Sequence, residues 1–160
     1  MASVLVLCSV EHLQDELLQE VGAFSGKVGI YVSLNKTQKS MEDLLRKQNI
    51  DTDKLFFVDC VTTERVRDDV LHISPEQLDL LSAAIRAFFS EIPGDKFLII
   101  DALSTLLIYN NENKVAKFVK ELTDAATRAD VAVVAFSPKT QEEELLEKIF
   151  NFFDHVEKRT

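Results

Sequence analysis

Short apolar runs alternate with stretches of helical periodicity along the whole chain. The runs lie at Ser3–Cys8, Val28–Leu34, Leu55–Cys60, Phe97–Ile100 and Val131–Phe136, with a weaker sixth at His155–Lys158. Each run is too short for a helix, and most are continuously apolar rather than alternating. That pattern is typical of strands buried on both faces of a parallel sheet.

Between the runs, apolar residues recur at steps of three and four, which indicates amphipathic helices. The clearest examples are Leu78–Phe89 and Val115–Ala126, and further helices are expected at Glu11–Phe24 and Gln141–Phe153. Three segments have the spacing of a helix-capping box. They predict helix starts at Ser40, at Thr140 and at Ser74, where Pro75 would take the first helical position.

This alternation predicts a single α/β domain over residues 1–160. We expect a three-layer sandwich with a mostly parallel sheet of five to six strands and helices on both faces. The stretch Val61–Ile73 has no clear period and is interpreted as a surface loop. In open α/β sheets, ligands bind beyond the carboxyl ends of the strands. The candidate segments are therefore Cys8–His12, Asn35–Ser40, Asp59–Glu64, Asp101–Thr105 and Ser137–Thr140.

Composition and net charge exclude several classes of protein. The hydrophobic fraction of 46% and the charged fraction of 28% exclude intrinsic disorder. A net charge of −9 argues against a nucleic acid partner. No apolar run approaches the roughly 18–20 residues of a membrane span, so no membrane contact is expected. Two cysteines, Cys8 and Cys60, without a secretory signal predict reduced thiols and a cytoplasmic location.

The segment FLIIDALSTLL places Asp101 at the end of a buried strand, with Ser104 and Thr105 just beyond it. An acidic side chain in this position is costly to bury unless it is paired or binds a cation. The same pattern occurs in Walker B strands, whose Asp helps to hold Mg²⁺ in nucleoside triphosphatases. The alternative interpretation is an Asp that caps the following turn.

Four segments carry a family resemblance: GIYVSLN, KQNIDTDKLFFVD, FLIIDALSTLL and FFDHVEK. In this order they resemble the KaiC and RadA branch of the RecA-type ATPases over nearly the full chain. The resemblance implies a P-loop NTPase-like fold that assembles side by side into rings or filaments. It also implies a nucleotide crevice at Ser9, Asn35, Asp101 and Ser104, with Asp101 as the metal-binding residue.

Two elements of that family are missing. A P-loop has the pattern G-x-x-x-x-G-K-[ST] after the first strand, where backbone amides and a Lys hold phosphates. This chain has CSVEHLQDELL there, with neither Gly nor Lys and with three carboxylates, Glu11, Asp15 and Glu16. The family's catalytic acidic pair aligns with Asn35 and Lys36, and neither residue serves as a general base at neutral pH. We therefore predict that the chain does not hydrolyse ATP.

Two hypotheses follow. In the first, the chain is a non-catalytic interaction or regulatory domain with no catalytic residues and no required cofactor, Mg-ATP being disfavoured. Its partner is a second copy or an active RecA/KaiC-family relative. In the second, it is a ligand-binding sensor or an enzyme whose crevice takes a nucleotide, a divalent cation or a small metabolite. The candidate residues for that crevice are Ser9, Glu11, Asn35, Asp59, Asp101, Ser104 and Ser137.

The cysteines and histidines add one weaker alternative. His12 lies close to Cys8 in sequence, so the two side chains form a candidate nucleophile and base. The favoured interpretation of Cys8 and Cys60 is that both are small buried apolar residues, because the chain lacks the paired spacing of a redox or zinc site.

Overall fold

The computed structural model describes residues 3–61, 70–138 and 143–159. Within them, seven strands form one parallel sheet in the order β4-β3-β2-β5-β6-β1-β7. The strands are β1 (Ser3–Cys8), β2 (Val28–Ser33), β3 (Leu55–Asp59), β4 (Leu71–His72), β5 (Lys96–Ile100), β6 (Ala132–Pro138) and β7 (His155–Arg159). The predicted α/β class and the parallel pairing are confirmed.

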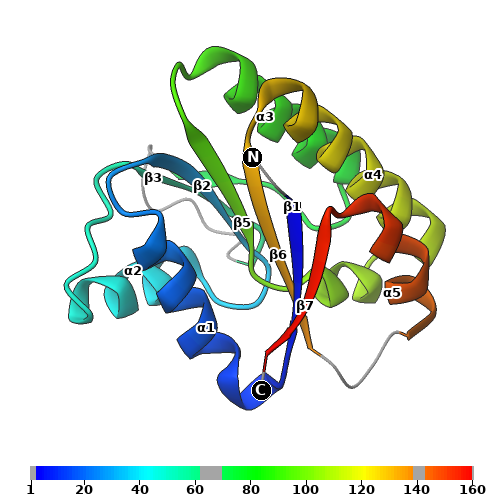
Figure 1. Ribbon diagram of the computed structural model, residues 1–160, viewed down its shortest axis with the longest axis horizontal. Coiled ribbons are helices and arrows are strands. Elements are labelled where there is room, and N and C mark those ends of the chain that lie inside the picture. The colour runs from blue at the N-terminus through cyan, green and yellow to red at the C-terminus, as the bar shows by residue number, and fades with distance from the viewer. Residues whose placement is uncertain (1–2, 62–69, 139–142, 160) are drawn as a thin grey trace.

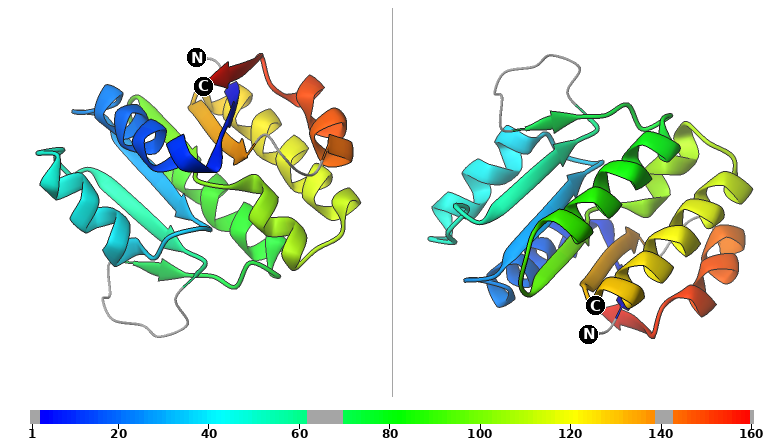
Figure 2. Two further views of the ribbon diagram at one scale, coloured as in Figure 1. Left: turned by 90° about the horizontal axis from the view of Figure 1, so that it is seen from below. Right: turned by 90° about the horizontal axis from the view of Figure 1, so that it is seen from above.

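Helices cover both faces of this sheet, as the three-layer prediction requires. One face carries α1 (Val10–Ala23) and α2 (Gln38–Lys47), as Figures 1 and 2 show. The other face carries α3 (Leu78–Glu91), α4 (Glu112–Ala129) and α5 (Glu143–Ile149), with the 3₁₀ helices η1 (Leu103–Ile108) and η2 (Phe150–Phe152). Each face buries its own apolar cluster against its helices, which is the main stabilising contribution to such a fold. In the described part of the chain, none of the helices has the length and apolar character of a membrane span.

Part of the segment interpreted as a loop is a strand. Leu71–His72 forms β4 and pairs with Val58 and Asp59 of β3 at the edge of the sheet. Residues 62–69 of the same segment lie outside the described residues. A strand of two residues has no periodicity to detect, which is why the pattern did not predict it.

The predicted start of α2 at Ser40 is wrong by three residues. The N-cap is Thr37, whose Oγ1 accepts a hydrogen bond from the backbone amide of Ser40 at 3.1 Å. Asp59 at the end of β3 accepts from the amide of Gln38, so a strand neighbour satisfies the first helical N–H. The tertiary contact therefore extends the helix beyond its local capping signal.

The predicted start of α3 at Ser74 is also wrong. Ser74 accepts hydrogen bonds from Glu76 and Gln77 and so forms a turn, and the helix begins only at Leu78. The start predicted at Thr140 lies outside the described residues, and the described helix covers Glu143–Ile149.

At one edge, β7 is fixed to its neighbours at both ends. Before the strand, Asp154 accepts a hydrogen bond from the backbone amide of Ser3 at 2.9 Å. At its other end, the Arg159 guanidinium bonds Glu16 at 3.1 Å and Glu20 at 2.9 Å, both on α1. These contacts tie the last strand to β1 and α1.

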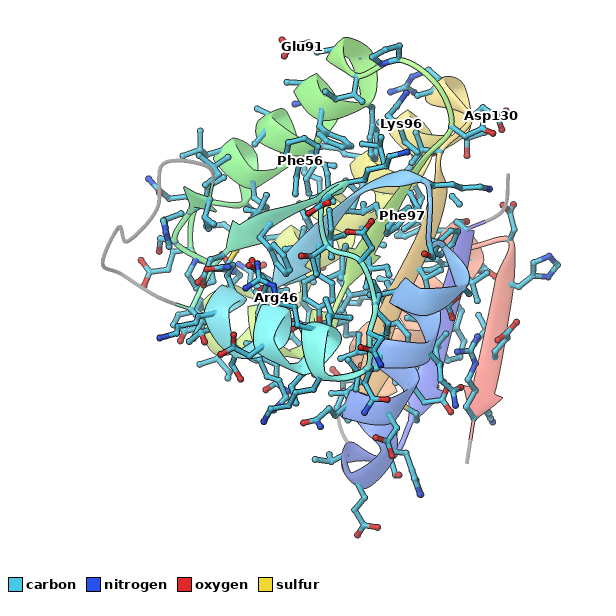
Figure 3. The ribbon with its side chains drawn as sticks, turned by 90° about the vertical axis from the view of Figure 1, so that its left-hand side faces the viewer. Arg46, Phe56, Glu91, Lys96, Phe97 and Asp130 are labelled. Atoms are coloured by element: carbon cyan, nitrogen blue, oxygen red, sulfur yellow. The ribbon has the colours of Figure 1, made fainter. Side chains whose placement is uncertain are left out.

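At the amino ends of the strands, Gly29 of β2 makes room for an aromatic stack. The Phe97 ring of β5 lies over Gly29, and Phe24 stacks on that ring at a centroid distance of 4.5 Å (Figure 3 labels Phe97). A Cβ on Gly29 would lie 2.2 Å from the Phe97 ring. The glycine is therefore required by close packing between neighbouring strands.

We expect Gly29→Ala to lower the free energy of unfolding by about 1–3 kcal/mol, because the Phe97 ring must move out of a packed core. The matched control is Gly22→Ala in α1, whose Cβ would meet Ile50 at an ordinary 3.6 Å. That change should leave stability unchanged or raise it by up to about 1 kcal/mol. Urea titrations followed by circular dichroism compare the two, and equal stabilities would contradict the packing argument.

Candidate functional site

The polar residues at the carboxyl ends of β2, β3 and β5 lie on the sheet face that α1 and α2 cover. Ser33 of β2 is in register with Asp59 of β3, and Val32 is in register with Ile100, the residue before Asp101. Asp59 is 2% exposed, and both Ser33 and Asp101 are fully buried. The carboxyl-end edge faces the viewer in the left panel of Figure 2.

The carboxylate of Asp101 fastens the loop between β2 and α2. Its Oδ1 accepts hydrogen bonds from the backbone amides of Leu34 at 2.6 Å and Asn35 at 3.1 Å. Its Oδ2 accepts from the hydroxyl of Tyr31 at 3.3 Å. Several donors thus converge on one buried carboxylate, which is how a protein satisfies an acidic group inside its core.

Burial raises the pKa of Asp101 to about 6, because desolvation disfavours the charged carboxylate. The backbone amides of Leu34, Asn35 and Lys36 and the Tyr31 hydroxyl act in the opposite direction and lower it. Burial also raises the pKa of Tyr31 well above its usual value, and the negative charge of the nearby Asp101 raises it further. At neutral pH, Asp101 is therefore largely ionised and Tyr31 is its donor.

Asp59 has a parallel role one strand further along the sheet. Its Oδ2 accepts from the amide of Gln38 at 3.1 Å and its Oδ1 from the amide of Val61 at 2.8 Å. The Gln38 amide group donates to buried Glu42 at 2.6 Å, and Glu42 pairs with Arg46 at 2.5 Å. Buried acidic groups therefore position both the start of α2 and the loop that precedes it.

A single residue connects β1 to α1. β1 ends at Cys8, Ser9 is the N-cap in an extended conformation, and the helix begins at Val10. The Ser9 hydroxyl makes no capping bond to the backbone and is hydrogen-bonded instead to Nδ1 of His12 at 2.7 Å. Strand and helix thus meet without a loop between them.

The predicted site residues lie in different surroundings among the described residues. Asn35 reaches Asp101 through its backbone amide, and its side chain is exposed. Ser104 lies on η1 and lines a shallow hollow of about 300 Å³ at the start of α4, which no other predicted site residue lines. Glu11 is exposed on the first turn of α1. Among the described residues there is no group of three metal-ligating side chains.

Two buried hydroxyls near this edge lack a hydrogen-bond partner among the described residues. They belong to Ser33, on the α1 and α2 side, and to Ser137 of β6, and both side chains are fully buried. Ser137 was among the predicted residues, whereas Ser33, Tyr31 and Glu42 were not. Gln38 fell within the predicted segment Asn35–Ser40 but was not singled out. The sequence pattern that could have identified Tyr31 and Ser33 is the presence of polar groups inside the apolar run VGIYVS.

In the described part of the chain, neither cysteine forms a nucleophile and base pair with a histidine. Burial raises the pKa of the Cys60 thiol to about 12, and the nearby carboxylates of Asp59 and Asp101 add to the effect. The thiol therefore stays protonated, which makes it a poor nucleophile. Cys8 is fully buried, whereas His12 is exposed and bonded to Ser9, so the suggested pair of Cys8 and His12 is not formed.

Comparison with known proteins supports the fold. Residues 28–150 match the model of a family described as "Protein of unknown function (DUF835)". No curated protein matches the chain at a significant level. The KaiC-like protein PH0186 from the hyperthermophilic archaeon Pyrococcus horikoshii OT3 superposes with a TM-score of 0.70 at 12% identity, over 97% of this chain and 69% of that one. The uncharacterized protein PH0321 from Pyrococcus horikoshii, solved in complex with an unknown peptide, gives 0.75 at 12% identity, over 98% and 76%.

These likenesses show the fold, because identities of 12% are too low to carry function. The predicted resemblance to KaiC-like proteins is confirmed at that level.

The raised pKa of Asp101 predicts a pH-dependent stability. A carboxyl with a pKa near 6 in the folded chain and 3.8 in the unfolded chain binds protons more tightly when folded. Stability should therefore be greatest below about pH 4 with respect to this group and fall by on the order of 3 kcal/mol as the pH rises through 6.

Asp101→Asn should remove most of that slope, because its side-chain oxygen still accepts from Leu34 and Asn35 but carries no charge. Asp95→Asn, at an exposed position, is the matched control and should keep the slope. Urea titrations between pH 4 and 8 test this expectation. An unchanged slope in Asp101→Asn would show that another group causes the pH dependence.

Proposed function

We propose that this chain, which belongs to the DUF835 family of proteins of unknown function, is a non-catalytic interaction domain with a KaiC-like fold. In this proposal the phosphate-binding loop has been lost and the carboxyl-end edge of the sheet serves protein contacts. The partner is a second copy of the chain or a RecA/KaiC-family relative.

The connection between β1 and α1 is the observation that carries the proposal. A phosphate-binding loop needs several residues with free amides between strand and helix, and here only Ser9 lies between Cys8 and Val10. The first turn of α1 also carries the acidic Glu11. Its carboxylate would repel a phosphate that approached the helix N-terminus.

The state of Asp101 supports the same proposal. A metal-binding Asp presents its oxygens to an open crevice, whereas both oxygens of Asp101 accept protein hydrogen bonds and the side chain is fully buried. Its role in this proposal is to hold the loop after β2. No cofactor is then required.

Apolar side chains at the carboxyl-end edge support an interaction role. Val10 and Val61 come shortly after β1 and β3, Ile108 is the last residue of η1, and Tyr109 follows it. Their exposed fractions are 67% for Val10, 40% for Val61, 76% for Ile108 and 48% for Tyr109. Exposed apolar groups of this size favour contact with another protein over contact with a charged ligand.

A second candidate function is a sensor or enzyme for a small ligand at the same edge. It is favoured by the unpartnered hydroxyls of Ser33 and Ser137, because a buried hydroxyl without a partner is a vacant hydrogen-bonding position. A neutral metabolite or a divalent cation suits the acidic surroundings of Asp59 and Asp101 better than a triphosphate does.

Calorimetric titration with ATP, with and without Mg²⁺, tests the loss of the nucleotide site. We expect no binding tighter than about 1 mM, or roughly −4 kcal/mol, in either condition. Magnesium-dependent binding of wild type that disappears in Asp101→Asn would contradict the proposal and favour a retained nucleotide site.

Affinity capture from a lysate tests the interaction role. We expect the wild-type chain to retain a RecA/KaiC-type ATPase, identified by mass spectrometry, or a second tagged copy. Ile108→Asp should reduce that retention, because a charge would replace an apolar side chain that is 76% exposed. Leu80→Asp is a matched control, since Leu80 is 50% exposed on α3. Retention of neither class of partner by wild type would argue against this function.

A further inference from the structure

The β7 edge of the sheet is open. β7 pairs with β1 on one side, and no strand of the described residues pairs with it on the other. Its residues from His155 to Lys158 are exposed, including Val156 at 38%. Figure 1 shows β7 as the last strand of the sheet, beyond β1. An unpaired edge strand presents backbone amides and carbonyls that can pair with another chain.

This edge is held in an extended conformation before any partner arrives. β7 is in register with β1 over five residue pairs, from His155 opposite Val4 to Arg159 opposite Cys8. The bonds of Asp154 to Ser3 and of Arg159 to Glu16 and Glu20 fix its two ends. A second strand would therefore dock on an ordered template and lose little of its own conformational freedom.

We propose that β7 pairs antiparallel with β7 of a second copy, about a two-fold axis at Val156. The two sheets would then form one continuous sheet across the dimer. The proposal rests on the interaction role proposed above and extends it: contact with a second copy is placed at the β7 edge, a surface separate from the carboxyl-end edge.

Charge complementarity selects this register. With Val156 opposite itself, the carboxylate of Asp154 lies opposite the ammonium group of Lys158 of the other copy, and His155 lies opposite Glu157 as a hydrogen-bonding neighbour. Opposite charges on facing residues stabilise an antiparallel pair, and like charges destabilise it. A register centred on Glu157 would place two carboxylates together, and one centred on Lys158 would place two ammonium groups together.

The side chains also lie on suitable faces. Val156 and Lys158 are in register with Leu5 and Leu7, which belong to the apolar cluster on the α3, α4 and α5 side. His155 and Glu157 alternate to the α1 side, where Glu157 bonds Arg159 at 2.7 Å. Facing residues of an antiparallel pair share one face, so the two Val156 side chains would meet each other with an Asp154–Lys158 pair on either side of them, and His155 and Glu157 would pair on the opposite face.

Lysines at an edge usually prevent pairing with other strands. Here Lys158 is matched in the antiparallel register by Asp154 of the other copy. The charges of Lys158 and Asp154 therefore disfavour other registers and permit the register centred on Val156.

Disulfide trapping tests the register directly. In Val156→Cys the two thiols would face each other at an antiparallel Cα separation of about 4.5–5.5 Å, within the range that a disulfide spans. In the control Lys158→Cys the two positions are offset by four residues along the strands, roughly 13 Å, which a disulfide cannot span. The native cysteines Cys8 and Cys60 are buried and do not interfere.

With oxidised glutathione as the oxidant, we expect Val156→Cys to form a covalent dimer at least about ten times faster than Lys158→Cys. Equal rates for the two variants, or no covalent dimer from either, would overturn the proposal. The calorimetric titration and the capture of a RecA/KaiC-type ATPase do not depend on β7 pairing, so a failure of β7 pairing is distinguishable from a failure of the proposed function.

Sedimentation of the unmodified chain provides a second measurement. We expect a concentration-dependent dimer that Lys158→Glu shifts towards monomer, because the introduced carboxylate would face Asp154 of the other copy. Lys47→Glu makes the same change in net charge at an exposed position near the end of α2 and should leave the equilibrium unchanged. An equal effect of both substitutions would show that net charge, and not the β7 register, controls association.

Discussion

The buried carboxylate of Asp101 is the interaction on which the carboxyl-end edge depends. A charged group in the core must be satisfied locally, and here the donors come from a neighbouring strand and from the loop that follows it. Satisfying Asp101 therefore fixes the path of the chain after β2. Asp59 then accepts the first amide of α2, so two acidic side chains set both the loop and the helix that follows. A role in ligand binding would compete with this structural role for the same oxygens.

The other side of this edge is organised by the lack of a loop after β1. Ser9 alone turns the chain from strand to helix, which leaves Val10 projecting into solvent. In the function that we propose, this compact turn and the engaged Asp101 are complementary changes. One removes the amides that would hold phosphates, and the other uses the carboxylate that would hold their metal. In that proposal the sheet and its helices remain, and the exposed edges serve protein contacts.

Sequence patterns predicted the fold framework well, because continuous apolar runs leave few alternatives to buried parallel strands. They located Asp101 at a strand end and left open whether it binds a cation or makes local bonds. The backbone amides of Leu34 and Asn35 decide between those roles in this structure, and a sequence does not reveal where amides point. The start of α2 was misplaced for a related reason, since Asp59 satisfies Gln38 from another strand. Ser33 was missed because a single serine in an apolar strand is common and does not by itself indicate a functional role.

The position of β1 has a consequence for how the chain folds. Val4 is in register with Val134 of β6 on one side and with His155 of β7 on the other, so the first strand lies between the last two. Such pairings close very long loops, and folding slows as contacts become less local. During synthesis the amino-terminal strand must wait for the carboxyl-terminal residues before its edges are covered. Until then β1 is an apolar strand with two uncovered edges, which is the kind of surface that favours aggregation of a partly folded chain.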